Sequence, residues 1–235
     1  LVGRAFIERG LPLRGKGVFV GLLSSEDVSV RRLAAIGVIW GDLLLRKEEG
    51  RVAEDAFNAL LRITPASKDE ESFYGATARA LGDHHFKKRE YKKAAVAYLT
   101  ARKFIKDPAL GLRTARVVGL AGRAGASIKL YENIIGAGLP AGLKGEAYSG
   151  LGAVYFKVKM WQESLASFKV AAPALGGEEL NEALYRIGEC NLFVGNVKEA
   201  AAAWQMVSDK DAAGIFGRLA RERLKENSAW EQALR

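Results

Sequence analysis

Apolar residues recur with a helical period in two stripes between residues 147 and 172, and a short polar break separates the stripes. In the first stripe, AYSGLGAVYF, Gly152 and Tyr155 lie on one side of the predicted helix. In the second stripe, WQESLASFKVA, Leu165 and Phe168 share a face at the three-residue spacing of a helix. The pattern predicts two amphipathic helices joined by a short turn and packed against each other.

The same two-stripe pattern occurs three more times along the chain. The position of Gly152 is taken by Gly82, Ala115 and Gly188 in the other copies, so the successive steps are 33, 37 and 36 residues (115 − 82, 152 − 115 and 188 − 152). The copy around Ala115 departs most from the pattern. A period in this range indicates a solenoid of stacked helical hairpins.

Glycine in the middle of a helix costs roughly 1 kcal/mol relative to alanine, so its recurrence calls for a packing reason. Two helices of a hairpin approach closely where both carry a small residue at the crossing point. An aromatic side chain four residues later in the second helix then fills the wedge between them. The predicted small pairs are Gly82 with Ala94, Gly152 with Ser164, and Gly188 with Ala200, and the aromatic residues are Tyr98, Phe168 and Trp204.

These positions resemble the tetratricopeptide repeat (TPR) family, whose consensus has W…LG…Y in the first helix and A…F…A in the second. The resemblance covers residues 30 to 207 and implies an all-α fold, a right-handed α-solenoid of antiparallel helix hairpins with about ten to twelve helices. The clearest copy matches at Tyr148, Leu151, Gly152, Tyr155, Ser164, Phe168 and Ala171. The expected repeats are 30–66, 75–108, 109–140, 145–176 and 181–210.

The first expected hairpin has Trp40 and Leu43 in one helix and Ala56 and Leu60 in the next. Before it, residues 1–29 contain Pro12 and five glycines, which are expected to interrupt any helix. We therefore expect a short helix or an irregular segment packed on the first hairpin.

Residues 211–235 form the other end of the predicted stack. Ile215, Phe216 and Leu219 lie on one face of an amphipathic helix, and arginine and glutamate lie on the other. A helix of this kind is expected to cap the last hairpin. The tail is also similar to the ends of repeat proteins of the bacterial envelope, which favours the cell envelope or periplasm over the cytoplasm.

Composition adds a strong local bias of charge. The net charge is +9, and 49% of the residues are hydrophobic, as in ordinary globular proteins. Residues 79–129 carry thirteen Lys or Arg and three acids, so this stretch alone contributes +10 (13 − 3). No apolar run approaches the roughly 18 residues of a membrane span. Cys190 is the only cysteine, which excludes an intramolecular disulfide.

The sequence offers little material for catalysis. Gly10–Gly17 matches a phosphate-binding loop as far as G-x-x-x-x-G-K, but Gly17 stands where a magnesium-binding hydroxyl is needed. His84 and His85 are the only histidines, and neighbours on a helix point about 100° apart, so they cannot share a metal as an i, i+4 pair can. We expect no catalytic residues, no metal site and no cofactor.

The segment KKREYKK at residues 87–93 is basic and contains an aromatic residue, which is a pattern found in nucleic-acid-binding proteins. Tyr91, however, occupies the position of Trp161 in the later copy, where it is expected to pack at the hairpin turn. A solvated basic edge is the favoured interpretation. A solenoid that binds RNA or an anionic surface through residues 79–129 is kept as the alternative.

The resemblance also implies a binding groove on the concave surface, lined by the first helix of each hairpin, for a partner protein or an extended peptide. The expected function is a non-catalytic scaffold or adaptor in a bacterial multi-protein assembly. Arg113 and Arg116 are one helical turn apart and could bind a carboxylate or phosphate of a partner, or instead pair with neighbouring acids. The asparagines with which one subset of the family grips chaperone C-termini are absent. The expected groove residues are Arg79, Asp83, Lys87, Arg113, Arg116, Ser149, Lys157, Tyr185 and Glu189, and the mapping also places Ala153 between Ser149 and Lys157.

Overall fold

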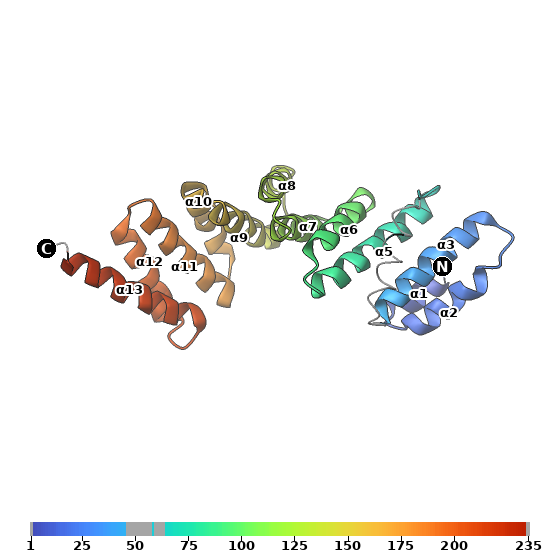
Figure 1. Cartoon of the computed structure of the whole chain (residues 1–235), viewed down its shortest axis with the longest axis horizontal. Helices are drawn as coiled ribbons and strands as arrows, with labels where there is room; N and C mark the ends of the chain where they lie inside the picture. Colours follow the sequence, from blue (N-terminus) through green and yellow to red (C-terminus); the bar gives the residue numbers. More distant parts are fainter. Residues whose placement is uncertain (1, 46–57, 59–63, 234–235) are drawn as a thin grey trace. The chain divides into compact units, whose positions relative to one another are not determined.

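A computed structural model describes residues 2–45, 58 and 64–233 of the chain (Figure 1). The described residues form twelve α-helices, one short 3-10 helix and no strand. The chain divides into two compact units, Leu1–Ala121 and Gly122–Arg235. The prediction of an all-α fold with about ten to twelve helices is confirmed.

Capping side chains start three helices of the first unit. The carboxylate of Asp27 accepts hydrogen bonds from the amides of Ser29 and Val30, and Asp107 accepts one from the amide of Ala109. Ser67 caps its helix in the same way, and such caps satisfy amides that have no partner within the helix. The helices of this unit are α1 (Val2–Glu8), α2 (Pro12–Leu22), α3 (Val28–Leu44), α5 (Lys68–Lys87), α6 (Tyr91–Phe104) and α7 (Pro108–Leu120).

The N-terminal segment is more helical than the sequence predicted. Pro12 does not interrupt a helix but begins α2, because proline fits the first helical turn, where its missing N–H has no partner to lose. The glycines of α2 do not break it either. A Cβ at Gly15 would lie 2.6 Å from the carbonyl oxygen of Gly3, so this glycine allows α1 to approach α2 closely. Of the first expected hairpin, Trp40 and Leu43 are buried in α3, whereas Ala56 and Leu60 lie outside the described residues.

The second unit contains one leading helix, two complete hairpins and a terminal helix. Its helices are α8 (Ala124–Gly136), α9 (Ala141–Lys157), α10 (Trp161–Ala171), α11 (Gly177–Phe193), α12 (Val197–Lys210) and α13 (Ile215–Ala233), with a 3-10 turn at Ala172–Ala174. The helix α13 packs on α12 and α11, as its amphipathic pattern predicts for a capping helix.

The recurring glycines lie where the two helices of a hairpin meet, and the residue that faces each glycine is the aromatic one. A Cβ at Gly188 would lie 2.3 Å from Nε1 of Trp204, and one at Gly152 would lie 3.1 Å from the ring of Phe168. The small residues of the second helices are buried beside this contact, and the Ser164 hydroxyl donates a 2.9 Å hydrogen bond to the Gly152 carbonyl. At each close approach, the aromatic ring of the second helix therefore packs against the backbone of the first helix at its glycine. The small residue of the second helix lies next to this contact.

Candidate functional site

In the first unit, three of the predicted groove residues form ion pairs, and two of them, Arg113 and Asp83, pair with each other. The Arg113 guanidinium donates to Asp83 at 2.8 Å, and the same carboxylate oxygen accepts a 2.6 Å hydrogen bond from the hydroxyl of Tyr98. Burial and then the hydrogen bond to Asp83 raise the pKa of Tyr98. Arg79 lies 3.8 Å from Asp107. Of the two possibilities considered for Arg113, binding a partner's acid group or pairing with a neighbouring acid, the structure shows the pairing with a neighbouring acid.

Lys87 and Arg116 are exposed, and neither forms an ion pair with a residue that the structure describes. In the basic segment at 87–93, the ring of Tyr91 lies 5.9 Å from that of Phe86, at the turn between α5 and α6. Tyr91 therefore packs within its own hairpin, as expected. His85 is buried, and its Nδ1 lies 2.5 Å from a carboxylate oxygen of Glu90.

At the other end of the expected groove, Tyr185 and Glu189 are covered by α13. Glu189 is only 8% exposed, and its carboxylate lies 2.7 Å from Arg186 and 3.2 Å from Arg223 of α13. The ring of Phe216, also on α13, lies 6.0 Å from that of Tyr185. These two groove candidates thus belong to the contact between α11 and its capping helix.

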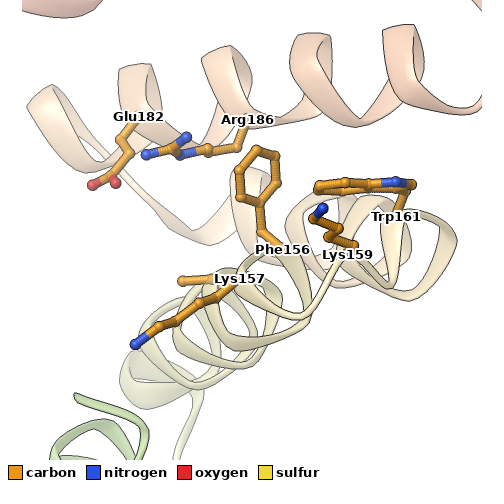
Figure 2. A pocket seen from close by; sticks show the side chains of 7 residues that line it. Phe156, Lys157, Lys159, Trp161, Glu182 and Arg186 are labelled. Carbon is orange, nitrogen blue, oxygen red and sulfur yellow. The ribbon is translucent and has the colours of Figure 1, made fainter. Parts of the chain in front are cut away.

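An open pocket of about 470 Å³ lies between α9 and α11, within the second unit (Figure 2). Of the predicted groove positions of this unit, Ala153 and Lys157 line it, whereas Ser149 is half-buried on α9, about one turn before Ala153. We call this site the α9–α11 pocket. Its lining residues are Ala153, Phe156, Lys157, Lys159, Trp161, Glu182 and Arg186.

Aromatic rings form one wall of the α9–α11 pocket. Phe156 rises from α9 toward α11, between Arg186 and Trp161 (Figure 2). Its ring centroid is 5.1 Å from that of Trp161, in an edge-to-face arrangement. The guanidinium of Arg186 lies 4.8 Å from the centre of the Phe156 ring, within the range of a cation–π contact. The aromatic wall therefore also helps to fix the position of the Arg186 guanidinium.

Three cations and one carboxylate line the pocket, which gives it an excess of positive charge. Lys159 is at the turn between α9 and α10, with a φ of 63° in the left-handed region that non-glycine residues rarely occupy. The equivalent position of the next hairpin is Gly195, with a φ of 88°. The turn thus needs this backbone conformation, and Lys159 adopts it at the edge of the pocket.

The charge on Arg186 is only partly compensated. Its partner Glu189 also pairs with Arg223, which lies 2.9 Å from Glu226. The hydrogen bonds to Glu226 and then to Tyr185 raise the pKa of Arg223, which therefore stays charged. One buried carboxylate is thus shared by two guanidinium groups. Arg186, at the pocket end of this chain of charges, keeps donors available for a further acceptor.

The repeat allows this pocket to be compared with the equivalent place in the first unit. Residues 70 apart are equivalent in hairpins α5–α6 and α9–α10, as Gly82 and Gly152 are, so Ala153 takes the position of Asp83. Residues 73 apart are equivalent in α7 and α11, so Arg186 takes the position of Arg113. In the first unit, the charge of Arg113 on α7 is neutralised by Asp83 on α5. Ala153 supplies no such carboxylate to Arg186.

Sequence reasoning did not identify most of this pocket. Phe156, Lys159, Glu182 and Arg186 were not among the candidates, and Trp161 was assigned only to packing. A signal for the pocket is present in the sequence, because aligning the repeats shows alanine at 153 where the equivalent position holds Asp83. That difference points to a binding site only once the structure shows that Arg186 lies opposite Ala153.

Two further features of the described residues bear on their chemistry. Among them there is no group of three His, Cys, Asp or Glu side chains able to hold a metal ion. Cys190 is buried against the Ser164 hydroxyl, and this burial raises the pKa of its thiol. None of the helices in this described part of the chain combines the length and the apolar character that a membrane span requires.

No protein-family model matches the sequence, and no curated protein matches it. Solved structures do resemble it. YrrB, described as a TPR protein with an unusual peptide-binding site, has a TM-score of 0.62 at 16% identity, over 87% of this chain and 97% of YrrB. BtubC from P. vanneervenii has a TM-score of 0.58 at 15% identity, over 86% of this chain and 89% of BtubC. MamA AMB-1 has a TM-score of 0.56 at 14% identity, over 79% of this chain and 94% of MamA.

Proposed function

We propose that this chain, which has the tetratricopeptide repeat fold, is a non-catalytic interaction scaffold that holds an acidic segment of a partner protein in the α9–α11 pocket. The fold and the repeat favour a binding role in general. The observation that carries the proposal is Ala153, which leaves Arg186 without the cross-hairpin carboxylate that Asp83 provides to Arg113. On the basis of the resemblance, we place the partner in a bacterial multi-protein assembly.

The pocket suits a carboxylate for two physical reasons. A guanidinium held against an aromatic ring loses less conformational freedom when it binds, and its planar array of donors matches a carboxylate in a bidentate arrangement. Lys157 and Lys159 add two exposed positive charges at the rim. Their contribution is screened by salt, so binding should weaken as the ionic strength rises.

The test introduces into the second unit the carboxylate that the first unit has. In the Ala153→Asp variant, the new side chain should pair with Arg186 and repel an acidic ligand. We expect the affinity for a fluorescein-labelled peptide of alternating glutamate and glycine or serine to fall roughly tenfold, or about 1.4 kcal/mol. Fluorescence anisotropy with the full chain measures the affinity.

The matched control is Ala166→Asp, the same substitution at an exposed alanine of the partner helix α10, outside the lining of this pocket. It should leave the affinity within about twofold of the wild-type value, because its charge is screened from the pocket by solvent and salt. An unchanged affinity in Ala153→Asp, or an equal loss in Ala166→Asp, would reject the pocket assignment.

A further inference from the structure

The wall of the α9–α11 pocket continues into an exposed aromatic stack. The ring of Trp161 lies face to face with that of Phe193, with centroids 4.2 Å apart and an angle of 16° between the planes. Phe193 is the last residue of α11 and is 54% exposed. Trp161 therefore belongs both to the pocket lining and to the stack. One rigid aromatic surface runs from the pocket to the turn at the end of α11.

Further apolar side chains lie exposed in the same hairpins. Val158 and Met160 are in the turn directly before Trp161, and Leu192 precedes Phe193. Lys157 and Lys159 alternate with these apolar residues along the chain. We call Trp161, Phe193, Val158, Met160 and Leu192 the aromatic edge. Its residues combine large apolar area with adjacent positive charge, a composition typical of binding surfaces.

The hairpin architecture does not require this stack. In the first unit, the positions equivalent to Trp161 and Phe193 are occupied by Tyr91 and Leu120, which cannot form an aromatic pair. There, Tyr91 packs on Phe86 at 5.9 Å in a tilted arrangement. The hairpin α5–α6 folds with that simpler contact. The exposed ring of Phe193 is therefore not needed for hairpin formation, which leaves it available for binding.

We propose that the aromatic edge receives an aromatic side chain carried by the same acidic segment that occupies the α9–α11 pocket. This inference rests on the proposed function and names the class of the partner: an acidic segment with a phenylalanine, tyrosine or tryptophan anchor. Charge complementarity selects this occupant, because Lys157 and Lys159 lie beside the apolar residues and suit carboxylates that flank the anchor. A ring of the partner stacks on the open face of Phe193, whose other face is already covered by Trp161.

The test compares two fluorescein-labelled peptides. One contains only glutamate, glycine and serine, and the other has a single phenylalanine in place of its central serine. Stacking and burial of one ring should make the phenylalanine peptide bind wild-type protein roughly tenfold more tightly. In Phe193→Ala this advantage should disappear, whereas the affinity for the peptide without phenylalanine should stay within about twofold of the wild-type value. Because Phe193 is largely exposed, its loss is tolerated by the fold, which circular dichroism verifies.

The matched control is Leu120→Ala, which truncates the equivalent position of the first unit, itself 41% exposed. It should leave the preference for phenylalanine intact. Equal affinity of the two peptides for wild-type protein, or a preference that survives in Phe193→Ala, overturns the inference while the proposed function stands. If instead neither peptide responds to Ala153→Asp, the proposed function has failed.

Two other occupants of the aromatic edge have distinct signatures. Self-association in sedimentation experiments that is abolished by Phe193→Ala would assign the edge to a second copy of the chain. Binding to phosphatidylserine vesicles that is lost in the same variant would assign it to a lipid surface. Either result overturns the inference.

Discussion

Replacing Gly188 by alanine tests the contact on which the hairpin packing depends. The added Cβ would lie 2.3 Å from Nε1 of Trp204. The indole is 1% exposed, and its Nε1 donates a 3.3 Å hydrogen bond to the Tyr185 carbonyl, so the ring cannot move aside without losing packing and a hydrogen bond. Overpacking of this kind costs about 1–3 kcal/mol. Alanine recovers only about 1 kcal/mol of helix propensity.

The equivalent substitution Gly152→Ala should have a different outcome. There the Cβ would lie 3.1 Å from the ring of Phe168, which has no hydrogen bond to hold it and needs to shift by only a few tenths of an ångström. The gain in helix propensity then offsets most of the strain, and we expect a stability within about 0.5 kcal/mol of the wild type. Gly188→Ala should be less stable than Gly152→Ala by about 1–2 kcal/mol.

Urea unfolding followed by far-ultraviolet circular dichroism measures the difference as a shift in the midpoint at constant slope. Gly17→Ala is the reference for helix propensity alone, because a Cβ there meets no atom within 4 Å, and it should stabilise the protein by roughly 0.5–1 kcal/mol. The reasoning is refuted if Gly188→Ala is as stable as the wild type, or if Gly152→Ala loses as much as Gly188→Ala.

Two further predictions concern the second unit. In Arg223→Gln, Glu189 should pair with Arg186 alone, and the affinity for the acidic peptide should fall roughly threefold in the anisotropy assay. Arg218→Gln, the same change on an exposed part of α13, should leave the affinity unchanged. Equal losses in the two variants would contradict the idea that Glu189 is shared by two arginines. The thiol of Cys190, whose pKa is raised by burial, should not react with a maleimide in the folded protein but should react fully in urea, and rapid labelling under native conditions would show that the site is open.

The hairpins could be predicted from the sequence because their determinants are local. The recurrence of Gly82, Gly152 and Gly188, each followed at a set distance by a large aromatic residue, specifies both the turn and the register of two neighbouring helices. The N-terminal segment could not be predicted in the same way. Pro12 and the glycines of α2 indicate a loop by their propensities, but Gly15 is a point of helix contact with α1, which propensity does not reveal.

The candidate site was predictable only in part. Mapping the groove positions of the resembled family onto this sequence gives Ala153 and Lys157, and both line the pocket. The same mapping assigns Tyr185 and Glu189 to the groove, although α13 covers both. Whether a groove position stays open depends on a helix about 30 residues further along the chain, and no periodic pattern encodes that contact.

The sequence by itself thus determined the all-α hairpin fold, since helix period and the pairing of small with aromatic residues act between neighbours along the chain. Only the tertiary structure decided how far each charge is compensated. Arg113 and Arg186 are equivalent in the repeat, but one meets Asp83 from the preceding hairpin and the other meets Ala153, Phe156 and a carboxylate shared with α13. The availability of a charge depends on the distance to every neighbouring group, and those distances exist only once the hairpins have packed.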